Sequence, residues 1–150
     1  MARRQSSHEW GQLALTVGPR VRLLRNALAS SSIAALEDFE LPTGSLTVLS
    51  LIAANPGCSQ TVLARGAGLN KSALVGIVDE LERQGLATRG RSPNDRRLNQ
   101  LTVTPAGQAA MTAMFERVRK GEDVIREALG AAEHRKLIDL LDRANAALEG

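Results

Sequence analysis

The sequence predicts a mainly α-helical fold with one small β-hairpin, and two observations carry this prediction. Stretches at both ends of the chain repeat apolar residues at the spacing of an α-helix. Between them, residues 86–103 hold two short strand-like segments around a loop rich in turn-forming residues. With 150 residues, 43% of them hydrophobic, the chain can bury one core, and we expect a single domain over residues 1–150.

The strongest helical pattern covers residues 70–85. Asn70 is a favourable N-cap, and Gly85 is a favourable residue just beyond the C-terminus. The opposite face is small and almost uncharged in its first two turns, a shape that lets a helix approach the base edges of DNA. In an isolated helix this face could equally be an ordinary solvated surface. The apolar stripe falls at i, i+3, i+4 and i+7 and consists of Leu74, Ile77, Val78 and Leu81.

A shorter predicted helix precedes this one. Ser59 can cap a helix over residues 60–65, and Gly66-Ala67-Gly68-Leu69 then supplies a short turn that contains glycine. Two helices joined by such a turn are the sequence signature of a helix-turn-helix, whose second helix enters the major groove of DNA.

The predicted hairpin follows directly. Residues 86–89 and 99–103 form its strands, and the connecting loop carries Arg91, Arg96 and Arg97, which could reach phosphates or the minor groove. Residues 59–104 contain seven Lys/Arg and four Asp/Glu, so their surplus of three equals the net charge of the whole chain. The positive field therefore belongs to this segment, as expected for a surface that binds duplex DNA.

This segment contains three short motifs: Leu81-Glu82-x-x-Gly85-Leu86-x-x-Arg89, Pro93-Asn94-Asp95-Arg96-Arg97 and Leu101-Thr102-Val103-Thr104-Pro105-Ala106-Gly107. Together these motifs resemble those of the MarR family of bacterial winged-helix regulators. The resemblance covers roughly residues 43–107 and implies a winged helix-turn-helix in which Asp95 and Arg97 brace the wing. The chain departs from the family pattern at Val75-Gly76, where many members carry a polar pair, so contacts near the start of the helix gain importance.

The outer segments are expected to form long helices. We expect a helix from about Gly18 to Glu37, another over residues 44–54, and a long helix from Pro105 that bends at Gly121 and ends at Gly130 before a final helix. Residues 11–40 and 105–149 thus flank a DNA-binding module at residues 41–104. Their apolar faces are larger than a module of this size can cover, which favours a homodimer. A three-helix bundle within one chain is the alternative.

The motifs assign expected contacts with double-stranded DNA. The N-terminus of the first helix of the helix-turn-helix would hold phosphates. The second helix would enter the major groove and make apolar contacts to thymine methyl groups. The wing would contribute its arginines. The expected contact residues are Ser59, Gln60, Thr61, Asn70, Lys71, Ser72, Ala73, Val75, Gly76, Arg91, Arg96 and Arg97.

The family resemblance implies a ligand-responsive repressor that leaves a pseudo-palindromic operator when a small aromatic or anionic effector binds between the outer helices and the DNA module. Arg20, Arg22 and Arg25 are candidates to meet such an anion, or they are solvated arginines on a helix face. Two other functions stay open: an oxidant sensor that uses Cys58, which could equally be an ordinary half-buried cysteine, and a ligand-independent module for protein contacts.

Other classes of protein fit the sequence poorly. The two histidines, His8 and His134, are far apart and Cys58 is the single cysteine, so we expect no metal site, no cofactor and no enzymatic activity. Three aromatic residues are too few for the stacking surfaces of a single-strand binder. No apolar run reaches the length of a membrane span or a signal peptide, and a cytoplasmic location is expected.

Overall fold

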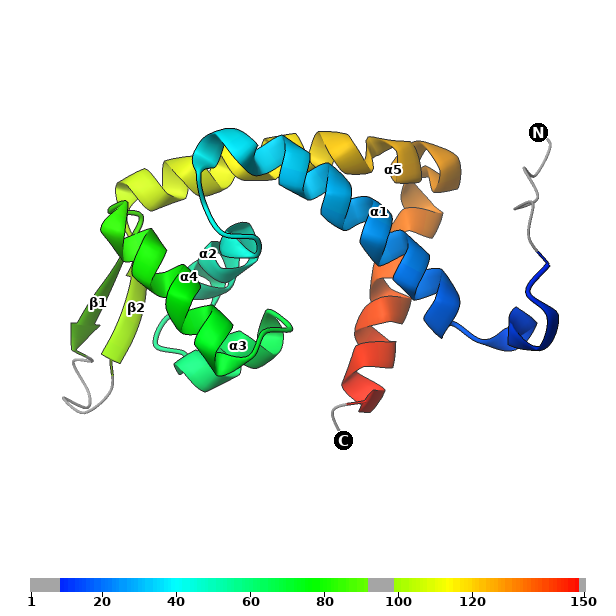
Figure 1. Cartoon of the computed structure of the whole chain (residues 1–150), viewed down its shortest axis with the longest axis horizontal. Helices are drawn as coiled ribbons and strands as arrows, with labels where there is room; N and C mark the ends of the chain where they lie inside the picture. Colours follow the sequence, from blue (N-terminus) through cyan, green and yellow to red (C-terminus); the bar gives the residue numbers. More distant parts are fainter. Residues whose placement is uncertain (1–8, 92–98, 149–150) are drawn as a thin grey trace.

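The computed structural model describes residues 9–91 and 99–148 and is mainly α-helical with a two-stranded hairpin, as predicted (Figure 1). The predicted helix-turn-helix, hairpin and outer helices all occur in the expected order. None of the described helices combines the length and the apolar character that crossing a bilayer requires. The elements are η1 (Gly11–Leu15), α1 (Gly18–Leu36), η2 (Glu37–Phe39), α2 (Ser45–Ala54), α3 (Gln60–Gly66), α4 (Lys71–Arg83), β1 (Ala87–Arg91), β2 (Asn99–Val103) and α5 (Pro105–Leu148).

The core lies within the central module, where α2, α3 and α4 pack against the hairpin and against the start of α5. Each element contributes the side chains of one face, because the apolar residues of the module recur at helical or strand spacing. Met114 of α5 is fully buried in the same cluster. The long helix is therefore anchored to the module at its N-terminal end. The largest fully buried apolar side chains are Leu49, Leu74, Leu81, Met114, Val48 and Val78.

The hairpin is antiparallel, with Ala87 opposite Val103 and Arg91 opposite Asn99. It begins after a tight helix end, where Gly85 has φ +70° and the Leu86 N–H donates to the Leu81 carbonyl at 2.8 Å. This left-handed residue at the helix end is the role predicted for Gly85.

The junction between the hairpin and α5 leaves no room for a side chain at Gly107. A Cβ atom at Gly107 would lie 1.9 Å from the Leu86 carbonyl oxygen. Thr104 joins the two parts, because its hydroxyl donates to the Gly85 carbonyl at 2.6 Å and accepts from the Gly107 N–H at 3.0 Å. The glycine and threonine of the third motif thus fix the angle at which α5 leaves the wing.

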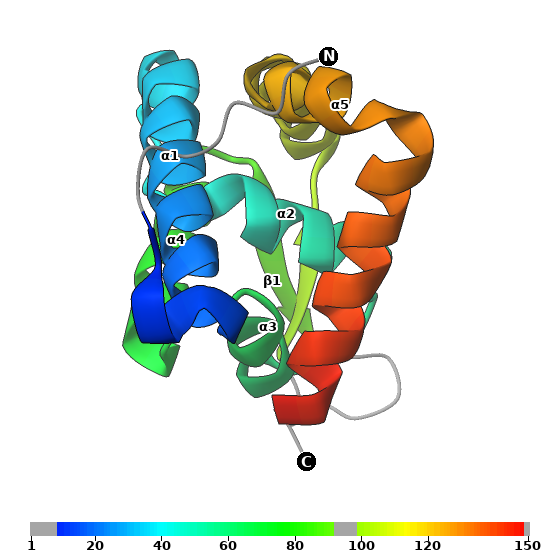
Figure 2. The ribbon, with the colours of Figure 1, turned by 90° about the vertical axis from the view of Figure 1, so that its right-hand side faces the viewer.

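The break in α5 occurs at Gly130, whose φ of 76° and ψ of 162° are not helical. Residues before and after it form two helical segments at a steep angle to each other (Figures 1 and 2). The end predicted at Gly130 is confirmed, whereas Gly121, where a bend was expected, keeps helical φ and ψ. Gly121 serves close packing instead, because a Cβ atom there would lie 2.5 Å from the hydroxyl oxygen of Ser31 on α1.

The first helix, α1, lies along the first segment of α5 but buries no residue of its own. The turn η2, which follows its C-terminal end, is tied to α5 by Arg117, which pairs with Asp38 at 2.9 Å and stacks over the Phe39 ring at 4.9 Å. The N-terminal end of α1 continues into the short turn η1 at the far side of the molecule from the hairpin (Figure 1).

Candidate nucleic-acid interface

Both helices of the helix-turn-helix are capped by the residues that the sequence predicts. The Ser59 hydroxyl accepts from the Val62 N–H at 3.3 Å, and the Asn70 carboxamide oxygen accepts from the Ala73 N–H at 2.8 Å. Each cap satisfies a backbone donor that the first helical turn leaves without a partner. Helices α3 and α4 therefore begin at fixed residues, which sets the positions of Gln60, Thr61 and Lys71.

The turn between α3 and α4 is tight because Gly68 adopts φ +65°, which a residue with a side chain rarely adopts. The Leu69 N–H donates to the Ala64 carbonyl at 2.8 Å, and the Gly68 N–H donates to the Arg65 carbonyl at 3.0 Å. These bonds close the end of α3 and direct the chain at once into α4. In Figure 1, α3, α4 and the hairpin lie together at one end of the molecule.

The two faces of α4 differ as predicted. The stripe of Leu74, Ile77, Val78 and Leu81 is buried, with at most 4% of each side chain exposed. On the opposite side Lys71, Ser72 and Gly76 are exposed, and Ala73 and Val75 are half-buried beside them. The residues expected in the major groove thus face outward from a rigid, well-packed helix.

A cluster of charged side chains connects α4 to β1. The Arg89 guanidinium pairs with Asp79 at 2.7 Å and also with the Glu82 carboxylate. The Arg89 backbone N–H donates to the other oxygen of Glu82 at 2.9 Å. The wing is therefore fixed to α4 by side chains as well as by the core, and the two carboxylates near the expected DNA surface are neutralised.

A second charged cluster lies at the C-terminal end of α4. Glu80 accepts two hydrogen bonds from Arg83, at 2.8 and 2.6 Å, and one from Gln84. These bonds lower the pKa of Glu80 to about 2, with Arg83 as the largest cause. The Gln84 amide also donates to the Glu40 carbonyl at 3.1 Å, which ties the end of α4 to the segment before α2.

The described part of the wing carries one of its three predicted arginines. Arg91 is exposed at the end of β1, opposite Asn99. Asp95, Arg96 and Arg97 lie in residues 92–98, outside the described residues. The proposed brace between Asp95 and Arg97 therefore stays a prediction.

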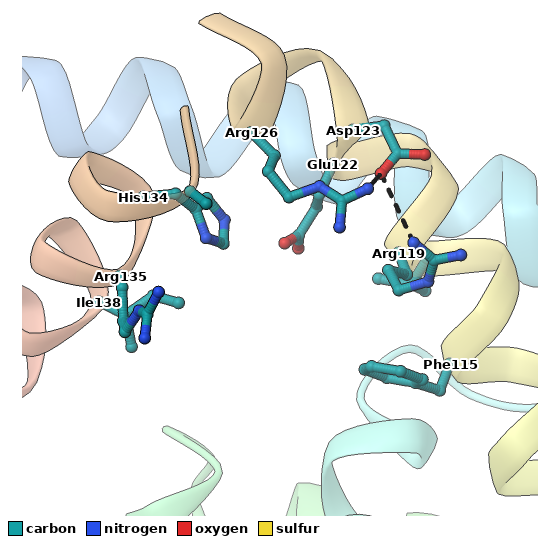
Figure 3. A pocket seen from close by; sticks show the side chains of 10 residues that line it. Phe115, Arg119, Glu122, Asp123, Arg126, His134, Arg135 and Ile138 are labelled. Atoms are coloured by element: carbon teal, nitrogen blue, oxygen red, sulfur yellow. Dashed lines mark hydrogen bonds and ion pairs between the residues drawn. The ribbon is translucent and has the colours of Figure 1, made fainter. Parts of the chain in front are cut away.

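Two hollows border α5. One, of about 440 Å³, lies between α2 and the first part of α5 and has an uncharged lining: Ser50, Ala53, Ala54, Gln108, Met111, Thr112 and Phe115. The other, of about 470 Å³, lies between the two segments of α5 and is lined by charged and apolar side chains that include Arg119, Asp123, His134 and Ile138 (Figure 3). Phe115 lines both hollows.

The arginines predicted to meet an anionic effector line neither hollow. Arg20 donates to the Leu13 carbonyl at 3.0 Å and to the Thr16 carbonyl at 2.6 Å, and stacks over Trp10 at 4.5 Å. It therefore fastens η1 to the start of α1. Arg22 and Arg25 are exposed on α1.

Cys58 is half-buried and packs against the core of the module, directly before the cap residue Ser59. This is the environment of a small packing side chain. The sequence did not reveal two other features: the double attachment of Arg89 to α4, and the position of Phe115 at both hollows. The first could have been read from Asp79 and Glu82, which lie one turn apart on the same side of α4.

The capped helix pair, its outward-facing second helix and the attached hairpin define a winged helix-turn-helix protein of the class that binds duplex DNA. Residues 39–98 match the sequence model described as MarR family. The match covers the helix-turn-helix and the first strand of the wing and confirms, over these residues, the resemblance inferred from the motifs. Members of that family are DNA-binding transcriptional regulators and not enzymes, in agreement with what the sequence led us to expect.

Individual relatives agree with this assignment. A candidate transcriptional regulator of the hcr operon from Thauera aromatica is 38% identical over 96 residues, which are 64% of this chain and 58% of that protein. The repressor CouR bound to a 23-mer DNA duplex is 29% identical, with a TM-score of 0.77 over 93% of this chain and 99% of CouR.

Two further solved structures contain small ligands. CouR from Rhodococcus jostii RHA1 bound to p-coumaroyl-CoA is 27% identical, with a TM-score of 0.79 over 89% of this chain and 94% of CouR. NadR in complex with 4-hydroxyphenylacetate is 26% identical, with a TM-score of 0.76 over 96% of this chain and 98% of NadR.

Proposed function

We propose that this chain is a homodimeric transcriptional repressor that releases a pseudo-palindromic operator when a small aromatic effector binds. The observation that carries the proposal is the large amount of apolar surface that the outer helices leave exposed in a single chain. α1 buries no residue, and only Gly107 and Met114 are buried among the 44 residues of α5. Exposed apolar side chains on these helices are Val21, Leu23, Ile33, Phe115, Val124, Ile138, Leu140 and Leu148.

This exposure favours a dimer over a closed three-helix bundle within one chain. Leu23 and Ile33 of α1 are 59% and 56% exposed, and Phe115 and Ile138 of α5 are 53% and 49% exposed. A bundle within the chain would cover these residues, whereas helices of a second copy can do so and can fill the hollow between the two segments of α5. Such a dimer presents two copies of α4, which suits two half-sites about 34 Å apart.

The uncharged hollow between α2 and α5 is the proposed effector site. Apolar and small side chains predominate in its lining, which suits an aromatic ring better than a free carboxylate. The ligands in the CouR and NadR structures, p-coumaroyl-CoA and 4-hydroxyphenylacetate, support an aromatic acid or its thioester as the chemical class.

Phe115 supplies a route from this site to the DNA-binding helices. It lines the proposed effector site and also the hollow in which a partner helix would lie. An effector that displaces Phe115 therefore changes the packing of the dimer and, with it, the spacing of the two α4 helices. The ligand binds preferentially to the form of the dimer in which the spacing of the two α4 helices does not match the two half-sites, and the operator is released.

The first experiment measures assembly and DNA binding together. Sedimentation should show a dimer, and a mobility-shift assay at stated salt should show binding to duplexes from the region upstream of the chain's own gene. Ile138→Glu should yield monomers and abolish the shift, because it places a charge on the proposed interface. Thr47→Glu, at an exposed position on α2, is the control and should leave both unchanged. A wild-type monomer that binds no duplex would contradict the proposal.

The second experiment tests the effector. Aromatic acids and their coenzyme A thioesters are screened for a rise in melting temperature, with coenzyme A alone as the control. A ligand at a hundredfold excess over its Kd stabilises the folded protein by about 2.7 kcal/mol. The same compound should abolish the DNA shift, and Ala53→Phe should prevent both effects by filling the hollow. A module that works without a ligand would respond to none of these compounds.

A further inference from the structure

Gly76 lies in the middle of α4 on its exposed side, and no contact among the described residues explains a glycine there. A Cβ atom at Gly76 would meet nothing within 4 Å, and its φ is not positive. Several other glycines have a reason inside the fold: Gly107 and Gly121 leave no room for a side chain, and Gly68 and Gly85 have positive φ. Gly76 has none of these reasons.

A glycine in this position weakens the helix. Among ordinary residues other than proline, glycine is the least favourable in a helix interior, and alanine is the most favourable. The chain therefore forgoes helix stability at an open site that would accept a methyl group without any clash of its own. The reason for the glycine lies outside the chain, at the surface that α4 faces when the protein is bound.

The surroundings of Gly76 indicate what approaches. Ser72 lies one turn before it, and Val75 is half-buried beside it. Asp79 lies one turn after it and is paired with Arg89 at 2.7 Å. The middle of this face offers no arginine, glutamine or asparagine, which are the side chains that form paired hydrogen bonds with a purine edge. Close apolar contact is the readout that remains.

We propose that Gly76 is the point where α4 comes closest to the base pairs, and that the space left by its absent side chain receives the C5-methyl group of a thymine. This methyl group is the apolar feature of the major groove, and it would contact the Gly76 Cα atom and the Val75 side chain. The inference rests on the proposed role of α4 in DNA binding, and it names the base that this part of the helix reads.

The test removes one methyl group from the DNA and adds one to the protein, first separately and then together. A duplex is first selected from a randomised pool with the wild-type protein, and each thymine of its half-sites is replaced in turn by deoxyuridine, which lacks the methyl group. At the contacted thymine, the replacement should weaken wild-type binding by about threefold or more per half-site, and Gly76→Ala should weaken binding to the thymine duplex by about tenfold or more.

The decisive result is the combination of the two changes. Gly76→Ala should bind the deoxyuridine duplex more tightly than the thymine duplex, because the methyl group added to the protein occupies the space vacated on the DNA. The melting temperature of Gly76→Ala and of Gly76→Leu should rise above that of the wild type, since both residues favour a helix over glycine. Weaker binding then cannot result from unfolding. Gly76→Leu should bind neither duplex.

Gly18→Ala is the matched control, because Gly18 also has open space around its Cβ position and an ordinary φ, but lies on α1. It should leave DNA binding unchanged. Undiminished binding of Gly76→Ala to the thymine duplex would overturn the inference, and so would an equal loss on both duplexes. If the wild-type protein binds no duplex at all, the proposed function fails, and the inference fails with it.

Discussion

Arg89 of β1 is attached to Glu82 of α4 at two points, through its backbone N–H and through its guanidinium group. The N–H donates to one carboxylate oxygen at 2.9 Å, and the guanidinium binds the other. Asp79 holds the remaining side of the guanidinium at 2.7 Å. The angle between the wing and the proposed recognition helix is thus set by three side chains.

Arg89→Ala should destabilise the fold and weaken DNA binding. The Arg89 and Glu82 side chains are each 28% exposed, so the loss of their bonds should lower the free energy of unfolding by about 1 to 2 kcal/mol. Urea denaturation measures this change. The variant also leaves two carboxylates without a cation near the DNA. Adding Asp79→Asn should therefore recover part of the DNA affinity but not the stability. If both recovered in parallel, Arg89→Ala would weaken DNA binding only through its effect on folding.

Gly107→Ala should be strongly destabilising, since its methyl group would overlap the Leu86 carbonyl oxygen. Relief requires the hairpin and α5 to move apart, and we expect a loss of about 3 kcal/mol in the free energy of unfolding. Thermal or urea denaturation measures it. Gly18→Ala, the same change at a position with open space, should be neutral or slightly stabilising. A stable Gly107→Ala protein would show that the junction is less rigid than its geometry implies.

The bond between Glu80 and Arg83 should make stability depend on pH in acid. Because the folded pKa of Glu80 is about 2, below the reference value of 4.5, the charged form favours the folded state above pH 4.5. This contribution is lost as the pH falls from 4.5 towards 2. Glu80→Gln should lower the melting temperature at neutral pH and flatten its dependence on pH in this interval, so that the variant and the wild type converge near pH 2. An unaltered profile would mean that Glu80 titrates normally.

Hydrogen peroxide should leave DNA binding intact, because Cys58 packs against the core. Cys58→Ser should behave as the wild type in the mobility-shift assay, with and without the oxidant. Loss of binding in peroxide that Cys58→Ser prevents would instead support the oxidant sensor.

The wing arginines should appear in the salt dependence of binding. Each of Arg91→Ala, Arg96→Ala and Arg97→Ala should reduce the slope of log K against log salt by about one if the residue contacts a phosphate. Arg143→Ala, an exposed arginine near the end of α5, should not change the slope. Unchanged slopes in all three wing variants would remove the wing from the interface.

Several local features of the module follow from the sequence because they depend on neighbours in the chain. The caps Ser59 and Asn70, the buried stripe of α4 and the left-handed Gly85 involve residues within a few positions of one another, and all were predicted correctly. The family motifs likewise lie within one continuous segment. For this reason the sequence alone was enough to predict the class of the module.

Other features depend on distant segments. The sequence alone assigned Gly121 to a bend, but its role is set by Ser31, ninety positions earlier in the chain and adjacent to it only when α1 lies along α5. Arg20 was named as a candidate to meet a ligand or as a solvated arginine, whereas in the fold one of its guanidinium nitrogens donates to the carbonyl groups of Leu13 and Thr16. A pattern along the chain cannot show which partner an arginine or a glycine finds across the fold.

The sequence by itself determined a mainly helical chain with a winged helix-turn-helix and its helix ends, because capping and periodic burial are local. Only the tertiary structure decided that Arg89 fastens the wing to α4, that Gly107 fixes the departure of α5, and that Phe115 faces two hollows. These relationships arise when segments far apart in sequence pack at contact distance, and the packing of the whole core sets that distance.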